Sequence, residues 1–439
     1  MAHTGVSVVN CSAVTALTPA TTPPQTRPVG PWQLLALGVN GIVGVGIFFA
    51  PAEVAALAPG RGAVLAFALT GLALVPVALA FAVLGRRFDA DGGPVVFARA
   101  AFGERASFLV GWVAYVSAFL STSAVVAGLA RALAPSLGLS EAVGQRALAT
   151  GLATVLAAVV ASGIRVSARA WTTLTVLKLL PLAGLLAAFA VAGGPHVPLV
   201  PAESGASWLR AGLAVMFAYQ GFEIVPVIAG QVRSSERTVP LATVGSLLAA
   251  VGLYVGLVWA CVAALPRLGQ AAAPLAAASG VWGGARLEQW VGLGTSVSAL
   301  GICLGMLVTT PRYLSALASG SRSLLGLEHM TAAGVPARAL AVTWGLVVLF
   351  VNLGDLSELF ALSSIAVLLQ YGVTATALAV LARRRARGLR PAHAWLALPT
   401  LVLGATLVIS GASAREAGVA SVTVLAGLGL MRLTRAREG

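Results

Sequence analysis

Two ionisable residues lie inside apolar segments, where a charge is costly. Lys178 is the only lysine among 439 residues and lies in the segment 171–191, while Glu223 lies in the segment 208–232. A charged side chain at the centre of a bilayer costs at least about 2.5 to 3.5 kcal/mol, so each residue is a candidate for ion or proton coupling. Two alternatives stay open: the Lys178 ammonium can extend to the membrane surface, and Glu223 can simply hydrogen-bond unwound backbone.

Two apolar segments are interrupted by glycine near their centres. The segment 34–57 carries Gly41, Gly44 and Gly46, and the segment 208–232 carries Gly221. Unwound backbone survives in a bilayer only where it lines a protein cavity, and paired interruptions in two halves of a chain indicate the substrate site of a secondary transporter. The alternative is close glycine packing between helices.

The substrate contacts expected from these breaks are mainly backbone groups. A half-helix that begins near Gly46 can hold a carboxylate with its free N–H groups. The carbonyls of Phe217, Ala218 and Gln220, at the break in the segment 208–232, can hold an ammonium. The candidate binding residues are Ile42, Val43, Gly44, Val45, Gly46, Phe217, Ala218, Tyr219, Gln220, Gly221, Tyr115, Ser121 and Ser363, with Ser117 and Ser364 beside them. The coupling candidates are Lys178 and Glu223.

The composition indicates an integral membrane protein that is helical throughout. The chain is 58% hydrophobic and 10% charged, with a mean hydropathy of +0.93, and a soluble domain needs far more charge on its surface. Stretches of about 20 apolar residues, each long enough to cross a bilayer, recur along it. The twelve predicted spans are 33–57, 62–84, 106–130, 147–164, 170–192, 208–232, 239–264, 289–313, 337–353, 357–381, 394–411 and 417–431.

The positive charge follows the predicted topology. The formal net charge is +14, and 20 arginines fall on the side that carries both termini, against 7 on the other side. This asymmetry predicts cytoplasmic termini in a multi-pass protein of the inner (cytoplasmic) membrane. The expected partners of the basic residues are anionic lipid headgroups rather than nucleic acid.

The predicted organisation is one transmembrane unit. Residues 1–30 are expected to form a disordered cytoplasmic tail, residues 31–385 the transporter core, and residues 386–439 two further helices with a short C-terminus. The core divides into halves at 33–192 and 208–381. Five spans in each half force opposite orientations, which predicts an inverted repeat.

Enzyme and channel functions find little support. The four histidines lie in loops or the tail, no HExxH or GxxxxGK[ST] motif is present, and the three aspartates, Asp89, Asp91 and Asp355, lie outside the spans. The three cysteines fit neither a disulfide framework nor a metal site. No cofactor, metal or catalytic residue is expected, nor is a ring of pore charges visible.

Six stretches in order resemble the amino acid, polyamine and organocation superfamily, bacterial amino acid permeases in particular. These stretches are GVGIF (44–48), GGPVVFARAAFG (92–103), KLLPL (178–182), FAYQGFE (217–223), ERTVP (236–240) and PRYLSALASG (311–320). The resemblance covers about residues 30 to 385. It implies the leucine-transporter-type fold of five plus five helices, with the first and sixth helices broken and two spans outside the core.

The resemblance also implies roles for individual residues. It places the substrate carboxylate on the amides of Val45 and Gly46 and its amine on the carbonyls of Ile42, Phe217 and Gln220. It implies that Lys178 replaces a bound sodium ion and links Glu223 to gating or proton coupling.

The substrate expected from the sequence is a neutral, apolar amino acid, because no span contains an aspartate to pair with a cationic side chain. Transport is expected to be sodium-independent, by proton coupling or exchange. A polyamine or cationic amino acid antiporter and a transporter-like nutrient sensor remain the alternatives.

Overall fold

The computed structural model describes residues 27–134, 137–139, 141–192, 207–271, 273–318, 326–353, 356–411, 425 and 427–429. Nearly all of these residues are helical, and the only β-pairing among them is one bridge between Val29 and Val232. The α-helices are α1 (Pro31–Ile42), α2 (Val45–Leu57), α3 (Arg61–Ala73), α4 (Val75–Gly85), α5 (Pro94–Phe102), α6 (Glu104–Leu133), α7 (Ala142–Ala161), α8 (Ile164–Ala192), α9 (Trp208–Tyr219), α10 (Ser235–Ala264), α11 (Pro274–Ala318), α12 (Ala337–Leu353), α13 (Leu356–Arg383) and α14 (Ala397–Gly411). The 3-10 helices are η2 (Phe222–Gln231), η3 (Leu268–Gln270), η5 (Ala386–Gly388) and η6 (Pro391–Leu396).

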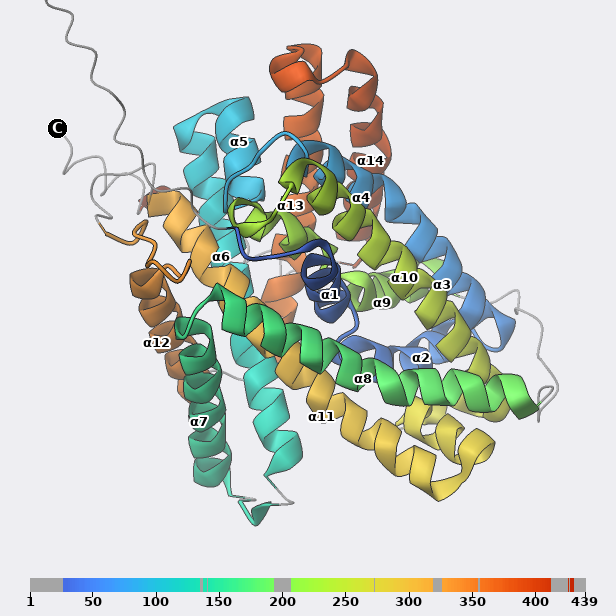
Figure 1. Cartoon of the computed structure of the whole chain (residues 1–439). Helices are drawn as coiled ribbons and strands as arrows, with labels where there is room; N and C mark the ends of the chain where they lie inside the picture. Colours follow the sequence, from blue (N-terminus) through green and yellow to red (C-terminus); the bar gives the residue numbers. More distant parts are fainter. Residues whose placement is uncertain are drawn as a thin grey trace, which may run out of the picture.

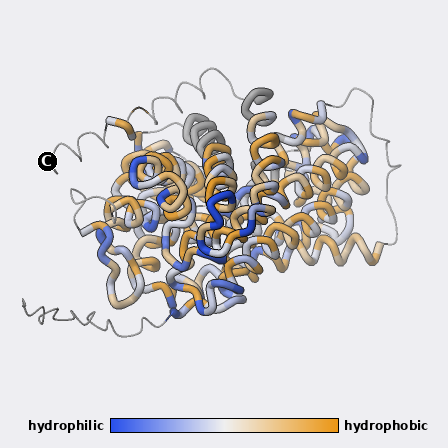
Figure 2. The backbone as a smooth tube through the Cα atoms, turned by 90° about the horizontal axis from the view of Figure 1, so that it is seen from above, coloured by the Kyte–Doolittle hydropathy of each residue, from blue (hydrophilic) through white to orange (hydrophobic). Residues whose placement is uncertain are grey.

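Several helical segments have the length and composition of membrane spans. In the described part of the chain, six are long and apolar enough to cross a bilayer: Arg61–Gly85, Glu104–Arg131, Ala142–Ala161, Ile164–Ala192, Ser235–Ala264 and Pro274–Ala318. Hydrophobic residues make up most of the tube in Figure 2. The fold is therefore that of a nearly all-helical membrane protein.

Some helix boundaries differ from the predicted spans. The span expected at 62–84 is divided at Leu74 into α3 and α4, because Pro76 has no N–H to donate to the preceding turn. Helix α11 begins at Pro274 rather than 289 and bends at Gly284, where φ is +74°. Most of the predicted span 417–431 lies outside the described residues.

The short helix α1 lies near the middle of the bundle (Figure 1) and packs against α8, α10, α11 and η2. The longest helix, α11, packs along both α6 and α8, while α7 and α12 lie side by side at one edge. The packing thus surrounds the first broken segment with protein on several sides. Its polar backbone groups are shielded from lipid, as a break in a membrane helix requires.

A buried ion pair ties three segments together at the end of the bundle that carries Val29. The Arg312 guanidinium of α11, 1% exposed, lies 3.0 Å from the Asp91 carboxylate in the loop between α4 and α5. Arg312 also donates to the Gly334 carbonyl at 2.8 Å, and Asp91 accepts the Gly230 N–H at 2.9 Å. Burial raises the pKa of the Asp91 carboxyl above its ordinary value, and Arg312 acts in the opposite direction.

Candidate functional site

The first break lies between α1 and α2. Helix α1 ends at Ile42, the Gly44 N–H turns back to the Ile42 carbonyl at 2.7 Å, and α2 begins at Val45. The first N–H groups of α2 have no acceptor within their own helix. Together with the helix dipole they favour an anion at this position, and Gly46 in this turn lines a cavity.

The second break lies between α9 and η2. Gly221 has a φ of +127°, a conformation that side chains disfavour. A Cβ added to Gly221 would overlap the carbonyl of Gly41. The two breaks therefore contact each other through the backbone of Gly41 and Gly221. This contact is possible because neither residue has a side chain. The last carbonyls of α9 have no partner within their helix, and Ala218 and Gln220 line the same cavity.

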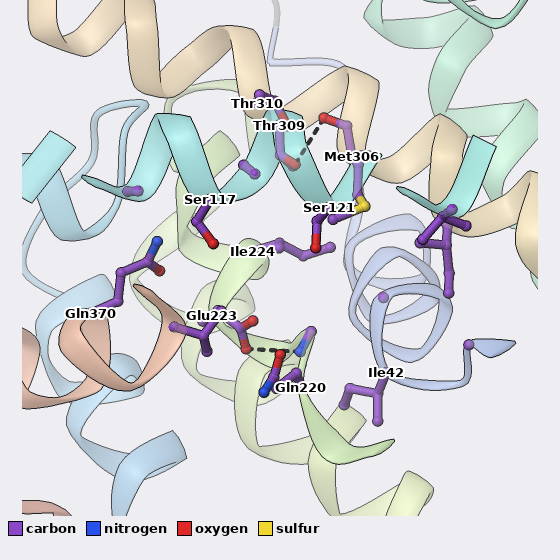
Figure 3. A pocket seen from close by; sticks show the side chains of 18 of the residues that line it. Ile42, Ser117, Ser121, Gln220, Glu223, Ile224, Met306, Thr309, Thr310 and Gln370 are labelled. Carbon is purple, nitrogen blue, oxygen red and sulfur yellow. Dashed lines mark hydrogen bonds between the residues drawn. The ribbon is translucent and has the colours of Figure 1, made fainter. Parts of the chain in front are cut away.

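The cavity is formed by both breaks together with α6, α11 and α13. Its empty volume is about 920 Å³, including space open to solvent. Its lining residues from the breaks are Gly41, Ile42, Gly44, Gly46, Ala218, Gln220, Gly221, Glu223 and Ile224. The remaining lining residues are Ala114, Ser117, Ala118, Ser121, Val125, Ile302, Met306, Thr309, Thr310, Tyr313, Val367 and Gln370. In Figure 3, polar groups from several helices face this common space.

Not every residue proposed from the sequence lies at the cavity. Tyr115 is 2% exposed, and its hydroxyl is 3.2 Å from that of Thr343 on α12. The Tyr219 hydroxyl donates to the Phe67 carbonyl at 3.2 Å, so this ring packs behind the break. The side chains of Val45, Phe217, Ser363 and Ser364 lie outside the described part of the structure.

Lys178 lies behind the first break rather than in the cavity lining. Its side chain is 0% exposed, and the ammonium donates to the Asn40 carbonyl at 2.8 Å, the Asn40 Oδ1 at 2.7 Å and the Val43 carbonyl at 2.5 Å. The Val43 carbonyl also accepts the Ser298 hydroxyl of α11 at 3.0 Å. The Lys178 ammonium thus connects α8 to the end of α1. The Val43 carbonyl that it bonds also accepts a hydrogen bond from Ser298 of α11.

Glu223 lines the cavity with a side chain held by two donors. Its Oε2 accepts the Gly221 N–H at 2.8 Å and the Tyr371 hydroxyl of α13 at 3.1 Å. The residue is 6% exposed. This carboxyl therefore connects the second break to α13, which places a titratable group at the wall of the cavity.

Several residues at the breaks and the cavity were not anticipated from the sequence. The Tyr254 hydroxyl of α10 donates to the Ile42 carbonyl at 2.8 Å. That carbonyl therefore accepts two hydrogen bonds, from Tyr254 and from the Gly44 N–H. Asn40 donates to the Gly301 carbonyl of α11. Gln370 and Thr310 also line the cavity. A polar amide side chain within an apolar segment is the signal that points to Asn40 and Gln370.

Sequence comparison finds similar proteins among transporters. The family model described as amino acid permease matches residues 29–422. An uncharacterised transporter of Mycobacterium tuberculosis is 29% identical over 412 residues, covering 91% of each chain. The serine/threonine exchanger of Bacillus subtilis is 25% identical, covering 92% of this chain and 95% of the relative. A branched-chain amino acid permease of Lactococcus lactis is 26% identical, covering 73% of this chain and 74% of the relative. The chain belongs to the amino acid permease family.

Proposed function

We propose that this protein is a secondary active transporter of neutral amino acids that works without sodium by alternating access. The observation that carries the proposal is that both helix breaks open onto one cavity. Free N–H groups at the start of α2 suit a carboxylate, and free carbonyls at the end of α9 suit an ammonium. A zwitterion carries both groups. Two relatives are named for neutral amino acids, serine/threonine and branched-chain.

The proposed membrane arrangement has twelve spans, ten of them in two inverted repeats of five, and cytoplasmic termini. The paired breaks and the arginine asymmetry support it. In this orientation the Asp91–Arg312 ion pair lies on the cytoplasmic side.

Lys178 is proposed to act as a tethered cation. Three oxygen acceptors around one ammonium form a site suited to a positive charge, and Lys178 fills it permanently. Transport therefore needs no sodium ion at this position. The proposed driving force is a proton gradient, with Glu223 as the proton carrier, or exchange of one amino acid for another.

The direct test of the proposed function is counterflow with the purified protein in proteoliposomes. Vesicles loaded with an unlabelled neutral amino acid should accumulate the labelled form equally well in sodium and choline buffers. Amino acid amides should compete at least about tenfold more weakly than the free acids, because they cannot place a charge on the α2 N–H groups. Binding without counterflow would indicate a sensor, and preferential counterflow of lysine, ornithine or a polyamine would indicate a cationic antiporter.

Glu223→Gln should separate proton coupling from substrate recognition. The glutamine oxygen can still accept the Gly221 N–H and the Tyr371 hydroxyl, so the cavity wall is expected to keep its shape. The variant should retain counterflow but lose accumulation driven by an imposed pH gradient, because an amide does not titrate. The measurement compares both modes in the same vesicles. If pH-driven accumulation persists, Glu223 has only a structural role.

A further inference from the structure

Asn40 is a buried amide in the last turn of α1, which packs against both α8 and α11. The residue is 0% exposed, and both polar atoms of its side chain have a partner. Oδ1 accepts a hydrogen bond from the Lys178 ammonium at 2.7 Å, and Nδ2 donates to the Gly301 carbonyl. Because a carbonyl only accepts and an ammonium only donates, this orientation of the amide satisfies both partners and the flipped one satisfies neither. One side chain therefore links α8 to α11 through α1.

The face of α11 opposite Asn40 carries glycine at two positions about one turn apart. A Cβ added to Gly301 would overlap the Asn40 Oδ1, and a Cβ added to Gly305 would lie 3.2 Å from the Asn40 Nδ2. The three atoms nearest to the Cβ position of Gly301 are Cγ, Oδ1 and Nδ2 of Asn40. The amide thus fits closely against α11. A methyl group on Gly301 would displace it from its partners.

The Asn40 oxygen is one of three acceptors that surround the Lys178 ammonium. The other two are the main-chain carbonyls of Asn40 and Val43. An ammonium has three N–H donors, so the number of these acceptors equals the number of donors. A main-chain carbonyl is present at position 40 with any residue, whereas Oδ1 belongs to the asparagine side chain. The place of the ammonium at the break therefore depends on that side chain.

We propose that Asn40 is a positioning residue for transport, whose amide fixes the Lys178 ammonium at the first break and couples it to α11. Movement of α11 away from α1 breaks the bond to Gly301 and frees the amide to rotate, which removes one acceptor from the ammonium. A change in the packing of α11 is in this way transmitted to the first break. The inference rests on the proposed transport and assigns Asn40 a role in the rate of the cycle. Asn40 is not among the described residues that line the cavity, so its loss should leave substrate affinity unchanged.

Asn40→Leu removes both hydrogen bonds of the amide with a side chain of similar size. In proteoliposome counterflow, the maximal rate per folded protein should fall at least about tenfold, the effect of losing a hydrogen bond to a charged group, with KM within about twofold of the original. Gly301→Ala should also lower the rate at unchanged KM, because its methyl group displaces the same amide. This second variant tests the inference even where Asn40→Leu does not fold.

A double variant tests whether the two substitutions act through one contact. Asn40→Ala removes all three atoms that the Gly301 methyl group would meet. Adding Gly301→Ala to Asn40→Ala should therefore cause no further loss of rate, although Gly301→Ala alone lowers it. Effects of residues that share a contact are not additive, whereas independent effects add.

The Lys178 ammonium can be observed directly, because the chain has no other lysine. Protein labelled with ¹⁵N-lysine gives a single side-chain Nζ signal in nuclear magnetic resonance. Asn40→Leu and Gly301→Ala should both shift this signal, because each takes the Oδ1 acceptor away from the ammonium. A general loss of packing at α11 would lower the rate without moving the signal.

Two control variants change the same helices without touching the amide. Thr175→Val removes a hydroxyl of α8 that donates to the Ala36 carbonyl of α1. Gly292→Ala adds a methyl group to α11 at a position with nothing within 4 Å. Both should keep the transport rate and the Nζ signal of the unmodified protein.

Three results would overturn the role of Asn40 while leaving amino acid transport intact. They are a normal rate in a folded Asn40→Leu, additive losses in the double variant, and an unchanged Nζ signal in Asn40→Leu and Gly301→Ala. An unmodified protein that transports no amino acid refutes the proposed function, and this inference with it.

Discussion

Lys178→Met is expected to abolish transport while leaving the protein folded. The methionine side chain is similar in length but removes the ammonium that Asn40 and Val43 share. A hydrogen bond to a charged group contributes about 1.5–3 kcal/mol, so losing the geometry of the break should reduce the transport rate by about a hundredfold or more. Removing a buried charge also removes its desolvation cost, which offsets part of the lost stability. The measurements are proteoliposome counterflow and the thermal unfolding midpoint in detergent.

The matched control is Ser298→Ala, which removes the other donor to the Val43 carbonyl without changing any charge. It should lower transport less than about tenfold, the effect of one neutral hydrogen bond. Normal transport by Lys178→Met would show that the tethered-cation proposal is wrong. A sodium requirement of the unmodified protein would show the same.

Lys178→Arg distinguishes a fixed charge from a proton carrier, since a guanidinium does not deprotonate in proteins. Retained activity with its pH dependence intact assigns the fixed charge to Lys178 and leaves coupling to Glu223. Retained activity with a flat pH profile assigns proton carriage to Lys178.

The positions of both breaks could be predicted from the sequence because glycine acts locally. Three glycines near the centre of one apolar segment and Gly221 in another mark where backbone must unwind, and the structure has helix ends at both places. The contact between Gly41 and Gly221 could not be predicted in the same way. It joins residues far apart in the chain and depends on how α1 and η2 pack.

Helical periodicity explains which of the predicted side chains of α6 line the cavity. Ser117 and Ser121 are four residues apart and share one face, and both line the cavity. Tyr115 is two residues before Ser117, on the opposite face, and bonds to Thr343 instead. The two-residue spacing already indicates that Tyr115 and Ser117 lie on opposite faces of the helix. Tyr115 was predicted to line the cavity from its side-chain chemistry, without regard to this spacing.

Long-range pairing explains what the sequence could not reveal about the first break. The rarity of lysine singled out Lys178, but its acceptors on α1 follow only from the packing of α8 against that helix. Tyr254 is one tyrosine among five in the chain, and nothing in its own segment indicates that it bonds to the Ile42 carbonyl. Partners of unwound backbone come from neighbouring helices, so their identity depends on the tertiary structure.

Gly221→Ala is expected to cause the largest loss of stability of any single methyl addition at the site. The added Cβ would overlap the Gly41 carbonyl, and φ of +127° is a strained conformation for alanine. Overpacking costs about 1–3 kcal/mol and backbone strain about 1–3 kcal/mol. Both penalties fall on the contact that holds the two breaks together.

The measurements for Gly221→Ala are the thermal unfolding midpoint and substrate binding, both of which should fall. The matched control is Gly252→Ala on α10, where an added Cβ meets nothing within 4 Å. That control should be neutral or slightly stabilising, because alanine favours a helix over glycine by about 1 kcal/mol. If Gly221→Ala unfolds at the temperature of the unmodified protein and still binds substrate, then moving the backbone of Gly221 away from that of Gly41 does not impair folding or binding. Backbone contact between Gly41 and Gly221 would then not be what fixes the shape of the cavity.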